Sequence, residues 1–511
     1  MQCLAFAQPD DARLSAYQPC NTRPPTLGHK THRTQTHCLP PIFSAKFQGM
    51  STVRPLESTA RGRAVAVLVE SYDGQALCHD LLETLQREQP LGPADAGLAA
   101  ELAIGVSRRR ITCEHLAAKY YRGRWAGLRE SIRVVMAVGV YQLCWLDRVP
   151  DYAAVDQSVR LMRRYGKGTA ATANAILRKI AEVRGETITR TVDTPPRRFL
   201  PLEGDRGVLF NEDVFPDPAR KPLDYLIAAY GYPPWLIERW HRLFKSELCR
   251  QVCEAGSQRP PLVLRPNRLR TTPDALRERL AADGVDCEIA EDGRSLIIRA
   301  AVTASEITPV SEGLCQPQDS TAQIALTLGA PTPGEFVIDL CAGSGTKSTQ
   351  AAEMMNNEGL VLAADVNERK LARVEEAAGR LGIGIVRTAA MNGLESDIRA
   401  AGRSPDLILV DAPCLNTGVL SRRPEARYRA GHKALLEIVE IQRGILEHAV
   451  SLAGPQTRIV YSTCSLERAE NEEQVRSFVA DHPKWEIREE KFTLPTRSRD
   501  GGYAAVLIRK S

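Results

Sequence analysis

Aromatic residues and net charge are both low in this sequence of 511 residues, and two common signatures are missing from it. Phe, Trp and Tyr make up 5% of the chain, and the net charge of +5 permits a nucleic-acid partner without requiring one. No apolar run approaches the length that spans a membrane, and the first residues lack the basic segment and apolar core of a signal peptide. We therefore expect a protein without a membrane partner.

The 13 cysteines lack the spacing of a disulfide framework or a zinc site. Their number is odd, no two form a CxxC pair, and Cys249 and Cys253 have no second pair to complete a zinc knuckle. We therefore expect reduced thiols, no bound metal and a cytoplasmic location.

The length is enough for about three domains. Residues 1–60 are rich in Pro, Thr, Gln, His and Arg and are expected to be disordered, or in part a spurious extension, because Met50 looks like a natural start. Residues 61–185 place apolar side chains at helical spacing and predict an all-α domain. The proline-rich, charged residues 186–223 indicate a linker.

The second half of the chain predicts two further domains. Residues 224–317 mix helical and strand patterns, as in a small α+β domain. In residues 318–511 strand and helix patterns alternate, which is typical of a doubly wound, mostly parallel α/β sheet of Rossmann-like type. A loop through Gly501 and Gly502 joins the last two strands, so one of them is expected to run antiparallel. The predicted fold class is therefore multidomain, with all-α, α+β and α/β parts.

Two groups of basic residues are candidates for contacts with RNA phosphates. Residues 108–110 and 160–167 are basic clusters of the helical domain, and either RNA contact or a solvated face would explain them. A basic edge beside a predicted strand of the α+β domain is a second candidate phosphate track. It consists of Arg265, Asn267, Arg268 and Arg270.

The segment "DLCAGSGTKS", residues 339–348, follows the first strand of the α/β region and opens a helix. Glycines at this place let the backbone approach a ligand, and Asp365 ends the next strand, where an acidic side chain reads ribose hydroxyls. A dinucleotide would favour GxGxxG, whereas S-adenosylmethionine needs only a shorter glycine turn and the acid. The loop is a candidate cofactor site, and a tight turn without a ligand is the alternative.

Two strand patterns, "DLILVDAPC" and "RIVYSTCS", end in the cysteines Cys414 and Cys464. Each thiol alone would more often be a small packing residue of the core. Ligands of open parallel sheets, however, bind outside the carboxyl ends of the strands. Both thiols, Asp411 and the glycine loop are therefore expected at one crevice.

Methylation of cytosine at carbon 5 is a reaction that uses such groups. Carbon 5 is a poor nucleophile until a thiolate adds to carbon 6 and converts the ring into an enamine. A carboxylate assists this addition by binding or protonating N3, and a second thiol assists the later release. The base must first be unstacked to enter the crevice.

"DAPC", "TGVLSRRPEARY" and "YSTCSLERAENEEQV" together closely resemble the RNA 5-methylcytosine methyltransferases of the Sun/Fmu/NOL family. "NAILRKI" at the end of a NusB-like helical domain, "PPLVLRPNRL" and "PQDSTAQ" extend the resemblance from around residue 61 to the C-terminus. The resemblance implies a NusB-like RNA-binding domain, S-adenosylmethionine as cofactor, and a monomeric enzyme that acts on 16S ribosomal RNA before the subunit is fully assembled.

The resemblance also implies roles for individual residues. Cys464 would be the nucleophile, Cys414 would assist release of the methylated RNA, and Asp411 would hold the cytosine near the methyl donor. Gln318 and Asp319 would border the same pocket. The residues that line the methionine part of the cofactor would be Cys341, Ala342, Gly343, Ser344, Gly345, Thr346 and Lys347.

Two places depart from the family pattern. The loop that usually reads APGGKT is Ala-Gly-Ser-Gly-Thr-Lys here, although Lys347 and a glycine turn are retained. Asn392 stands where an acid usually contacts the adenine side, so we expect weaker cofactor binding rather than none. Asp365 would still bind the ribose, and Cys341 is expected to be mainly a packing residue.

Three alternatives stay open at this point. A non-catalytic RNA-binding or antitermination-type protein would act through the helical domain and would need neither Cys464 nor the glycine loop. A methyltransferase for an exocyclic nitrogen would carry Asn/Asp-Pro-Pro-aromatic where this chain has Asp-Ala-Pro-Cys. Methylation of another RNA, such as tRNA, would use the same motifs.

Overall fold

The computed structural model describes residues 58–73, 76–166, 168–300 and 302–510. The predictions of disorder and of a spurious extension concern residues 1–60, of which all but the last three lie outside this range. Among the described residues, no helix is both long and apolar enough to cross a membrane.

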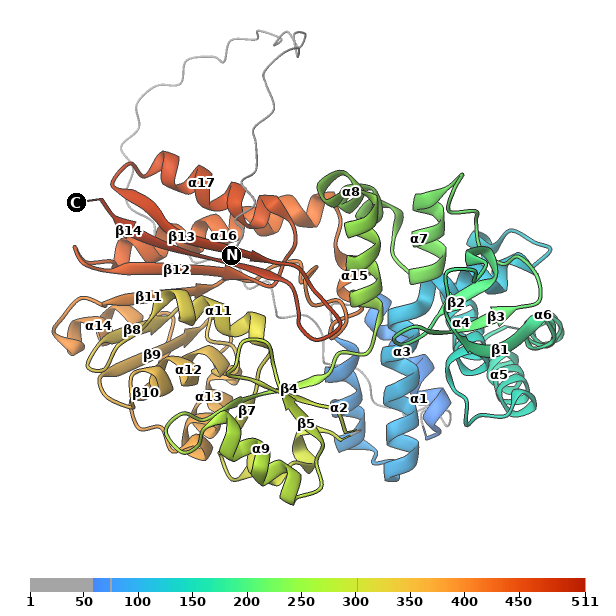
Figure 1. The fold of residues 1–511 in the computed structure, drawn as a ribbon, viewed down its shortest axis with the longest axis horizontal. Helices are drawn as coiled ribbons and strands as arrows, with labels where there is room; N and C mark the ends of the chain where they lie inside the picture. Colours follow the sequence, from blue (N-terminus) through green and yellow to red (C-terminus); the bar gives the residue numbers. More distant parts are fainter. Residues whose placement is uncertain (1–57, 74–75, 167, 301, 511) are drawn as a thin grey trace, which may run out of the picture. The chain divides into compact units, whose positions relative to one another are not determined.

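The N-terminal region is helical, as predicted, and helix α4 forms its centre (Figure 1). Twelve of the sixteen residues of α4 are buried, and the helix packs on α1, α3, α5 and α6, because it is apolar on almost every side. The helices are α1 (Ala60–Asp73), α2 (Cys78–Glu88), α3 (Pro93–Lys119), α4 (Glu130–Trp145), α5 (Asp151–Tyr165) and α6 (Thr169–Val183), with a 3₁₀ turn at Trp125–Gly127.

Residues 186–223, interpreted as a linker, contain most of a small antiparallel sheet. Its strands β1 (Arg184–Thr189), β2 (Phe199–Pro201) and β3 (Arg206–Phe210) lie in the order β1-β3-β2. Phe199 and Phe210 are buried, and Phe210 joins the hydrophobic core of the helices. Proline is tolerated in β2 because this strand lies at an edge of the sheet. The proline-rich composition concealed these short strands.

The small α+β domain is confirmed. Helices α7 (Pro222–Tyr230) and α8 (Pro234–Ser257) precede it, and Lys245 interrupts α8 with a φ of 63°. An antiparallel sheet follows in the order β5-β6-β4-β7. Its elements are β4 (Leu262–Pro266), α9 (Pro273–Ala282), β5 (Cys287–Ile289), β6 (Leu296–Ile298), α10 (Thr308–Ser311) and β7 (Cys315–Pro317).

The basic edge predicted in this domain is wrong as a continuous phosphate track. Arg265 is buried and pairs with Glu353 at 2.7 Å, so its charge is neutralised inside the protein. Asn267 is also buried, and its amide donates to the backbone carbonyl of Leu381 at 2.9 Å. Only Arg268 and Arg270 are exposed.

The C-terminal region is the predicted doubly wound sheet, with seven strands in the order β10-β9-β8-β11-β12-β14-β13. All neighbours are parallel except at β14, which runs antiparallel to β12 and β13, so the prediction for the last two strands is confirmed. The strands are β8 (Phe336–Asp339), β9 (Leu360–Asp365), β10 (Val386–Ala390), β11 (Leu407–Asp411), β12 (Arg458–Thr463), β13 (Trp485–Thr493) and β14 (Gly502–Arg509).

Helices cover both faces of this sheet because alternate strand residues point to opposite sides. Val337 of β8 packs in the cluster of α11 to α13, and Ile338 packs in the cluster of α14, α16 and α17. The helices are α11 (Ser320–Gly329), α12 (Thr346–Met354), α13 (Glu368–Leu381), α14 (Leu394–Ala401), α15 (Ala426–Arg429), α16 (His432–Leu452) and α17 (Glu472–Asp481).

The strand order reverses between β8 and β11. The chain proceeds from β8 outward to β9 and β10, then returns to β11 on the other side of β8. Crevices of open α/β sheets form at such a switch point, outside the carboxyl ends of the strands. The loop after β8, which carries the glycine turn, therefore meets the end of β11, where Asp411 lies.

Candidate active site

The glycine turn after β8 has the geometry of a ligand cradle. Gly343 and Gly345 have φ of +57° and +81°, in the left-handed region that favours glycine. A Cβ on Gly345 would lie 2.8 Å from Val374, whereas one on Gly343 would meet no atom closer than 4.0 Å and would project into open space. The turn thus exposes backbone on one side and is packed on the other.

Asp365 at the end of β9 is bound to this turn. Its Oδ2 accepts the backbone N–H of Gly343 at 2.9 Å, and its Oδ1 accepts that of Asn367 at 2.8 Å. A carboxylate oxygen can accept more than one hydrogen bond, so lone pairs remain for the hydroxyls of a ribose. The exposed glycine backbone and this acid fit S-adenosylmethionine.

On the other side of the crevice Asp411 and Lys347 form an ion pair. The Lys347 Nζ lies 2.6 Å from Asp411 Oδ2, and Ser462, the neighbour of Asp411 across the sheet, donates to Oδ1 at 2.7 Å. Burial alone would lower the pKa of the Lys347 ammonium, but the charge of Asp411 and their hydrogen bond raise it above its usual value. Lys347 therefore stays protonated and donates, and Asp411 accepts.

The two predicted thiols lie in contact. The Sγ atoms of Cys414 and Cys464 are 3.1 Å apart, and Cys464 Sγ lies 3.2 Å from Asn416 Oδ1. A hydrogen bond with Cys464, and then burial, raise the pKa of the Cys414 thiol well above its usual value. The Cys414 thiol therefore keeps its proton at neutral pH.

Glu470 joins the two loops that carry the thiols. Its buried carboxyl accepts the backbone N–H of Leu415 at 2.9 Å, the amide of Gln442 at 3.0 Å and the hydroxyl of Ser465. Leu415 and Ser465 directly follow Cys414 and Cys464. Burial raises the pKa of Glu470 to about 7. One side chain thus fixes the backbone next to both thiols.

Asn416 adds a second link between the same loops. It has a φ of 59°, a left-handed conformation that Asn tolerates better than most side chains. Its amide donates to the Cys414 carbonyl at 2.8 Å, and the N–H of Gly418 donates to the Cys464 carbonyl at 2.9 Å. The distance between the two sulfur atoms is therefore set by a network rather than by one turn.

The segment after Cys414, residues 415–430, is anchored to α3 and to the ends of α7 and α8. Arg427 is fully buried and donates to the backbone carbonyls of Arg108, Gly231 and Gly256 at 2.9, 3.0 and 3.0 Å. Its guanidinium lies 4.2 Å from the ring centroid of Tyr232. We call residues 415–430 the catalytic segment.

The basic cluster at residues 108–110 belongs to this contact, so neither interpretation offered for it is right. Arg108 and Arg109 are 9% and 3% exposed, and Arg108 donates to the Ser421 carbonyl of the catalytic segment at 2.8 Å. Arg110 binds Glu114 at 2.6 Å. These guanidinium groups bind protein atoms and do not form a surface for RNA.

The structure brings the glycine turn, Asp365, Asp411, Cys414 and Cys464 to one edge of the sheet. Asn392 follows β10 in an exposed turn at the same edge. Gln318 and Asp319 are buried in internal contacts: Gln318 binds Gln350 at 2.8 Å, and Asp319 binds Arg422 at 3.0 Å.

The residues that sequence reasoning did not assign are Asn416, Arg427 and Glu470. Arg427 lies in "RRPEARY" and Glu470 in "AENEE", so the motifs contain them, but their contacts join distant parts of the chain. Lys347 was assigned only to the cofactor side, whereas its ammonium binds Asp411.

Comparisons with known proteins agree with this architecture. Residues 325–506 match the family described as 16S rRNA methyltransferase RsmB/F. Residues 58–182 match the NusB family, and residues 232–303 match the ferredoxin-like domain of RsmF/B-like methyltransferases. The crystal structure of PH0851 superposes with a TM-score of 0.66 at 20% identity, over 90% of this chain and 99% of that one, which supports the fold.

Curated relatives match over nearly their whole length. The probable ribosomal RNA small subunit methyltransferase B of Bacillus subtilis is 27% identical over 434 residues, which cover 84% of this chain and 90% of that protein. The ribosomal RNA small subunit methyltransferase B of Escherichia coli is 30% identical over 482 residues, 90% and 100% of the two chains. The resemblance seen in the motifs is confirmed, and the chain belongs to the RsmB/F family of S-adenosylmethionine-dependent methyltransferases.

Proposed function

We propose that the protein methylates carbon 5 of a cytosine in 16S ribosomal RNA through a covalent adduct between Cys464 and carbon 6. The observation that carries the proposal is the pair of thiols, 3.1 Å apart, beside the Asp411–Lys347 ion pair. Direct transfer of a methyl group to a nitrogen needs no thiol, whereas addition to carbon 6 requires one.

The state of the thiols supports Cys464 as the nucleophile. The raised pKa of Cys414 keeps that thiol protonated, so it can donate its S–H to the sulfur of Cys464. The charges of Lys347 and a Cys464 thiolate attract each other, because Cys464 is among the groups that raise the pKa of Lys347. Lys347 and Cys414 thus place a positive charge and a proton donor beside the sulfur of Cys464, and the thiolate is the form that attacks.

The reaction then follows from the positions of these groups. Lys347 donates to the N3 edge of the cytosine and Asp411 accepts from its amino group, which polarises the ring. The Cys464 thiolate forms a bond to carbon 6 and the carbon 5–carbon 6 double bond breaks. Its electron pair forms a carbon 4–carbon 5 double bond, the enamine, while the electron pair of the carbon 4–N3 double bond moves to N3, where Lys347 donates a proton. S-adenosylmethionine, when bound, supplies an electrophilic methyl group for carbon 5.

Release reverses the addition. A base takes the proton from carbon 5, the double bond to carbon 6 re-forms, and the carbon–sulfur bond breaks with its electron pair on Cys464. The S–H of Cys414, in contact with that sulfur, stabilises the departing thiolate. This role matches the one implied by the family resemblance.

Trapping of the adduct tests the proposal. RNA with 5-fluorocytidine cannot lose fluorine in the final step, so the adduct should persist on a denaturing gel with the wild type and vanish with Cys464→Ala. Cys341→Ala, which removes a third thiol near the turn, is the matched control and should keep the adduct. With ordinary RNA, Cys414→Ala should accumulate adduct.

Two results would overturn the proposal in different ways. An adduct that depends on Cys414 alone would reverse the roles of the two thiols. No adduct with any RNA, in a protein that binds S-adenosylmethionine, would exclude carbon 5 chemistry and leave an exocyclic nitrogen or a non-catalytic role.

The RNA substrate rests on the relatives, whose names specify ribosomal RNA. We infer action as a monomer in the cytoplasm, where ribosomal RNA is available, on RNA that is not yet fully assembled. The protein can be incubated with protein-free 16S rRNA, assembled small subunits or tRNA. Mapping of 5-methylcytosine in each RNA would then identify the substrate. Modification of tRNA in preference to 16S rRNA would refute this part.

A further inference from the structure

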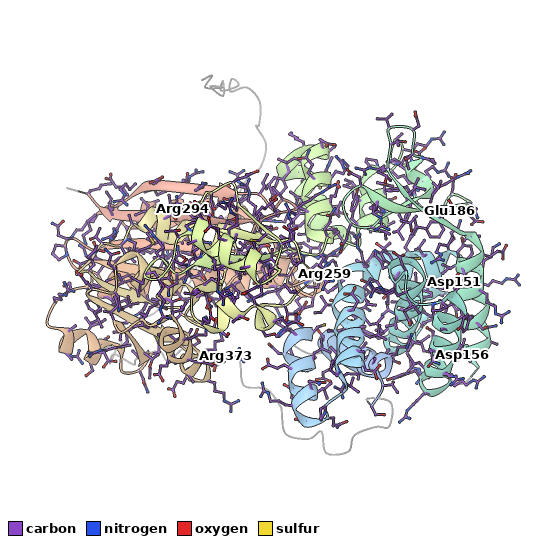
Figure 2. All side chains as sticks on the ribbon, turned by 60° about the horizontal axis from the view of Figure 1, so that its bottom comes forward. Asp151, Asp156, Glu186, Arg259, Arg294 and Arg373 are labelled. Atoms are coloured by element: carbon purple, nitrogen blue, oxygen red, sulfur yellow. The ribbon has the colours of Figure 1, made fainter. Side chains whose placement is uncertain are left out.

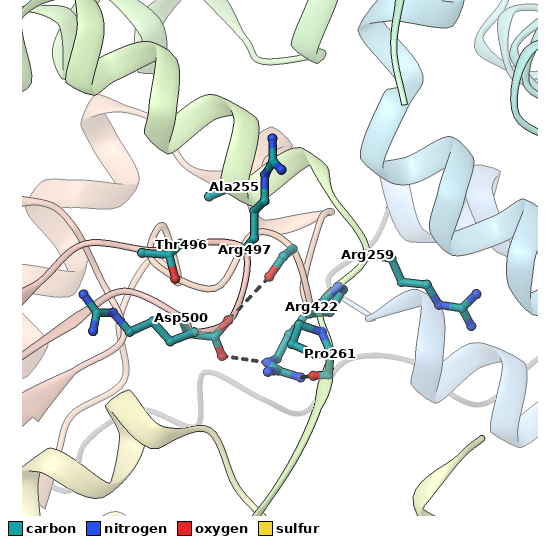
Figure 3. Close-up of a pocket in the computed structure, with 10 residues that line it drawn as sticks. Ala255, Arg259, Pro261, Arg422, Thr496, Arg497 and Asp500 are labelled. Atoms are coloured by element: carbon teal, nitrogen blue, oxygen red, sulfur yellow. Dashed lines mark hydrogen bonds and ion pairs between the residues drawn. The ribbon is translucent and has the colours of Figure 1, made fainter. Parts of the chain in front are cut away.

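The catalytic segment contains four arginines, and three of them are held by protein atoms. Arg422 pairs with Asp500 at 2.6 Å in the small hollow of Figure 3, and it also binds Asp319. Arg427 is buried among backbone carbonyls, and Arg429 donates to the Ser71 carbonyl at 3.2 Å. Arg423 differs, because its side chain is exposed to solvent.

Arg423 lies next to the thiols. Its Nη1 donates to Asn416 Oδ1 at 2.9 Å, and the same oxygen lies 3.2 Å from the Sγ of Cys464. Within the described residues no carboxylate forms an ion pair with Arg423, and its guanidinium is hydrogen-bonded to the side chain of Asn416. No carboxylate of the described residues therefore neutralises this guanidinium, which has further donors and lies two hydrogen-bond lengths from the sulfur.

The geometry of a pyrimidine nucleotide indicates which group of the RNA would meet this charge. In the common anti conformation carbon 6 is the ring carbon that faces the 5′ phosphate of the same nucleotide. A thiol that attacks carbon 6 therefore approaches the ring beside the edge that faces this phosphate. Arginine binds phosphate through two parallel N–H donors, better than any other side chain.

We propose that Arg423 binds the phosphate on the 5′ side of the cytidine that is methylated. This inference rests on the proposed function, since it takes Cys464 as the group that attacks carbon 6. The contact would hold the flipped nucleotide by its backbone while Asp411 and Lys347 hold its base. Because Asn416 touches both Arg423 and Cys464, phosphate binding would also steady the nucleophile.

Removal of one charge from the RNA tests the contact directly. The substrate is a short 16S rRNA fragment with 5-fluorocytidine at the mapped target, and the 5′ linkage of that nucleotide is replaced by a neutral methylphosphonate. The preceding sugar carries 2′-O-methyl in every RNA, which prevents cleavage. With limiting RNA, the neutral linkage should slow adduct formation by the wild type about 10- to 100-fold, the size expected for a charge-assisted hydrogen bond. The same linkage three nucleotides upstream is the control RNA.

Two variants of Arg423 show whether the effect of the neutral linkage depends on this side chain. Arg423→Ala should be slow on ordinary RNA by a similar factor and insensitive to the neutral linkage, and Arg423→Lys should recover part of both the rate and the sensitivity. Arg373→Ala is the matched control, because Arg373 is an exposed arginine of α13 (Figure 2) and its loss should leave the sensitivity to the linkage unchanged.

Other outcomes would refute the inference. If Arg423→Ala is slow but remains as sensitive to the linkage as the wild type, Arg423 only positions Asn416. If the wild type forms adduct equally fast with both linkages, no group reads that phosphate, and the proposed carbon 5 chemistry still stands. If the wild type forms no adduct with any RNA, the proposed function fails, and this inference fails with it.

Discussion

The two halves of the crevice are built in different ways. The cofactor half consists of one glycine turn and Asp365, which binds that turn through the backbone of Gly343. The thiol half consists of two loops that are joined by Glu470 and by the contact of Asn416 with Cys464. Its catalytic segment is anchored through Arg427 to carbonyls more than 150 residues away. The cofactor half is thus local, whereas the geometry of the thiols depends on the packing of the whole chain.

This difference gives the NusB-like region a second role. The buried cluster of the N-terminal helices continues into Leu420 and Ala426, which follow Cys414 in the sequence, and into Leu466, which follows Cys464. Loss of packing there would displace the catalytic segment without touching the glycine turn. Substitutions in the two halves should therefore separate stability and thiol chemistry from cofactor affinity.

The largest effect should come from Arg427→Met, which keeps the length of the side chain but removes its donors. The buried carbonyls of Gly231 and Gly256 lose this partner, and at about 1–3 kcal/mol for each unsatisfied group the free energy of unfolding should fall by about 2 kcal/mol or more. Urea unfolding measures this change. Below the transition, affinity for S-adenosylmethionine should stay near that of the wild type, while the rate of adduct formation falls.

Arg423→Met is the matched control for stability, since Arg423 is an exposed arginine of the same segment and its loss should change unfolding by less than about 0.5 kcal/mol. If Arg427→Met weakens cofactor binding as much as it slows the adduct, the two halves are not independent, and the comparison is wrong.

The free energy of unfolding should also depend on pH, by a comparable amount, through one carboxyl in each half of the crevice. Burial raises the pKa of Asp339, behind the glycine turn, and of Glu470, between the thiols, to about 7 in both cases. In the unfolded chain both carboxyls ionise at about pH 4. Between these values the folded protein binds more protons than the unfolded chain, so stability should fall as pH rises from 4 to 7 and level off above.

Each of these carboxyls should contribute on the order of 2–3 kcal/mol to that fall. Asp339→Asn and Glu470→Gln should each flatten part of the stability profile measured by urea unfolding from pH 4 to 8. Only Glu470→Gln, in the thiol half, should alter the rate at which iodoacetamide alkylates Cys464. Asp339→Asn, in the cofactor half, should leave that rate unchanged. A profile that rises between pH 4 and 7 would show that both carboxyls are ionised in the folded protein.

A smaller effect, confined to the ligand, is expected from Asp365→Ala. The variant loses the acceptor proposed for the ribose, and affinity for S-adenosylmethionine should fall about 10- to 100-fold, as for loss of a hydrogen bond to a charged group. Equilibrium dialysis measures this. Alkylation of Cys464 should be unchanged, because Asp365 contacts only the turn and the start of α13. A change in thiol reactivity would break the separation of the two halves.

The same contrast explains how far the sequence could predict the molecule. The glycine turn and Asp365 were found because strand, loop and helix are adjacent in the chain and the pattern is local. Arg108 was misjudged because nothing near it in the sequence shows that its partner, Ser421, lies 313 residues further on. Glu470 was quoted within a motif but given no role, since its acceptor function exists only when both loops are in place.

The smallest predicted effect concerns Cys341, which lies in the cofactor turn but packs against the core. Its side chain is partly buried against the cluster that covers one face of the sheet, and burial raises the pKa of its thiol well above the usual value. Cys341→Ala removes one sulfur atom, so the free energy of unfolding should fall by about 1 kcal/mol. Cofactor affinity and adduct formation should change less than threefold. A large loss of cofactor affinity would mean that this side chain lines the methionine part of the ligand, and the local half of the crevice would then depend on a side chain as well as on its backbone.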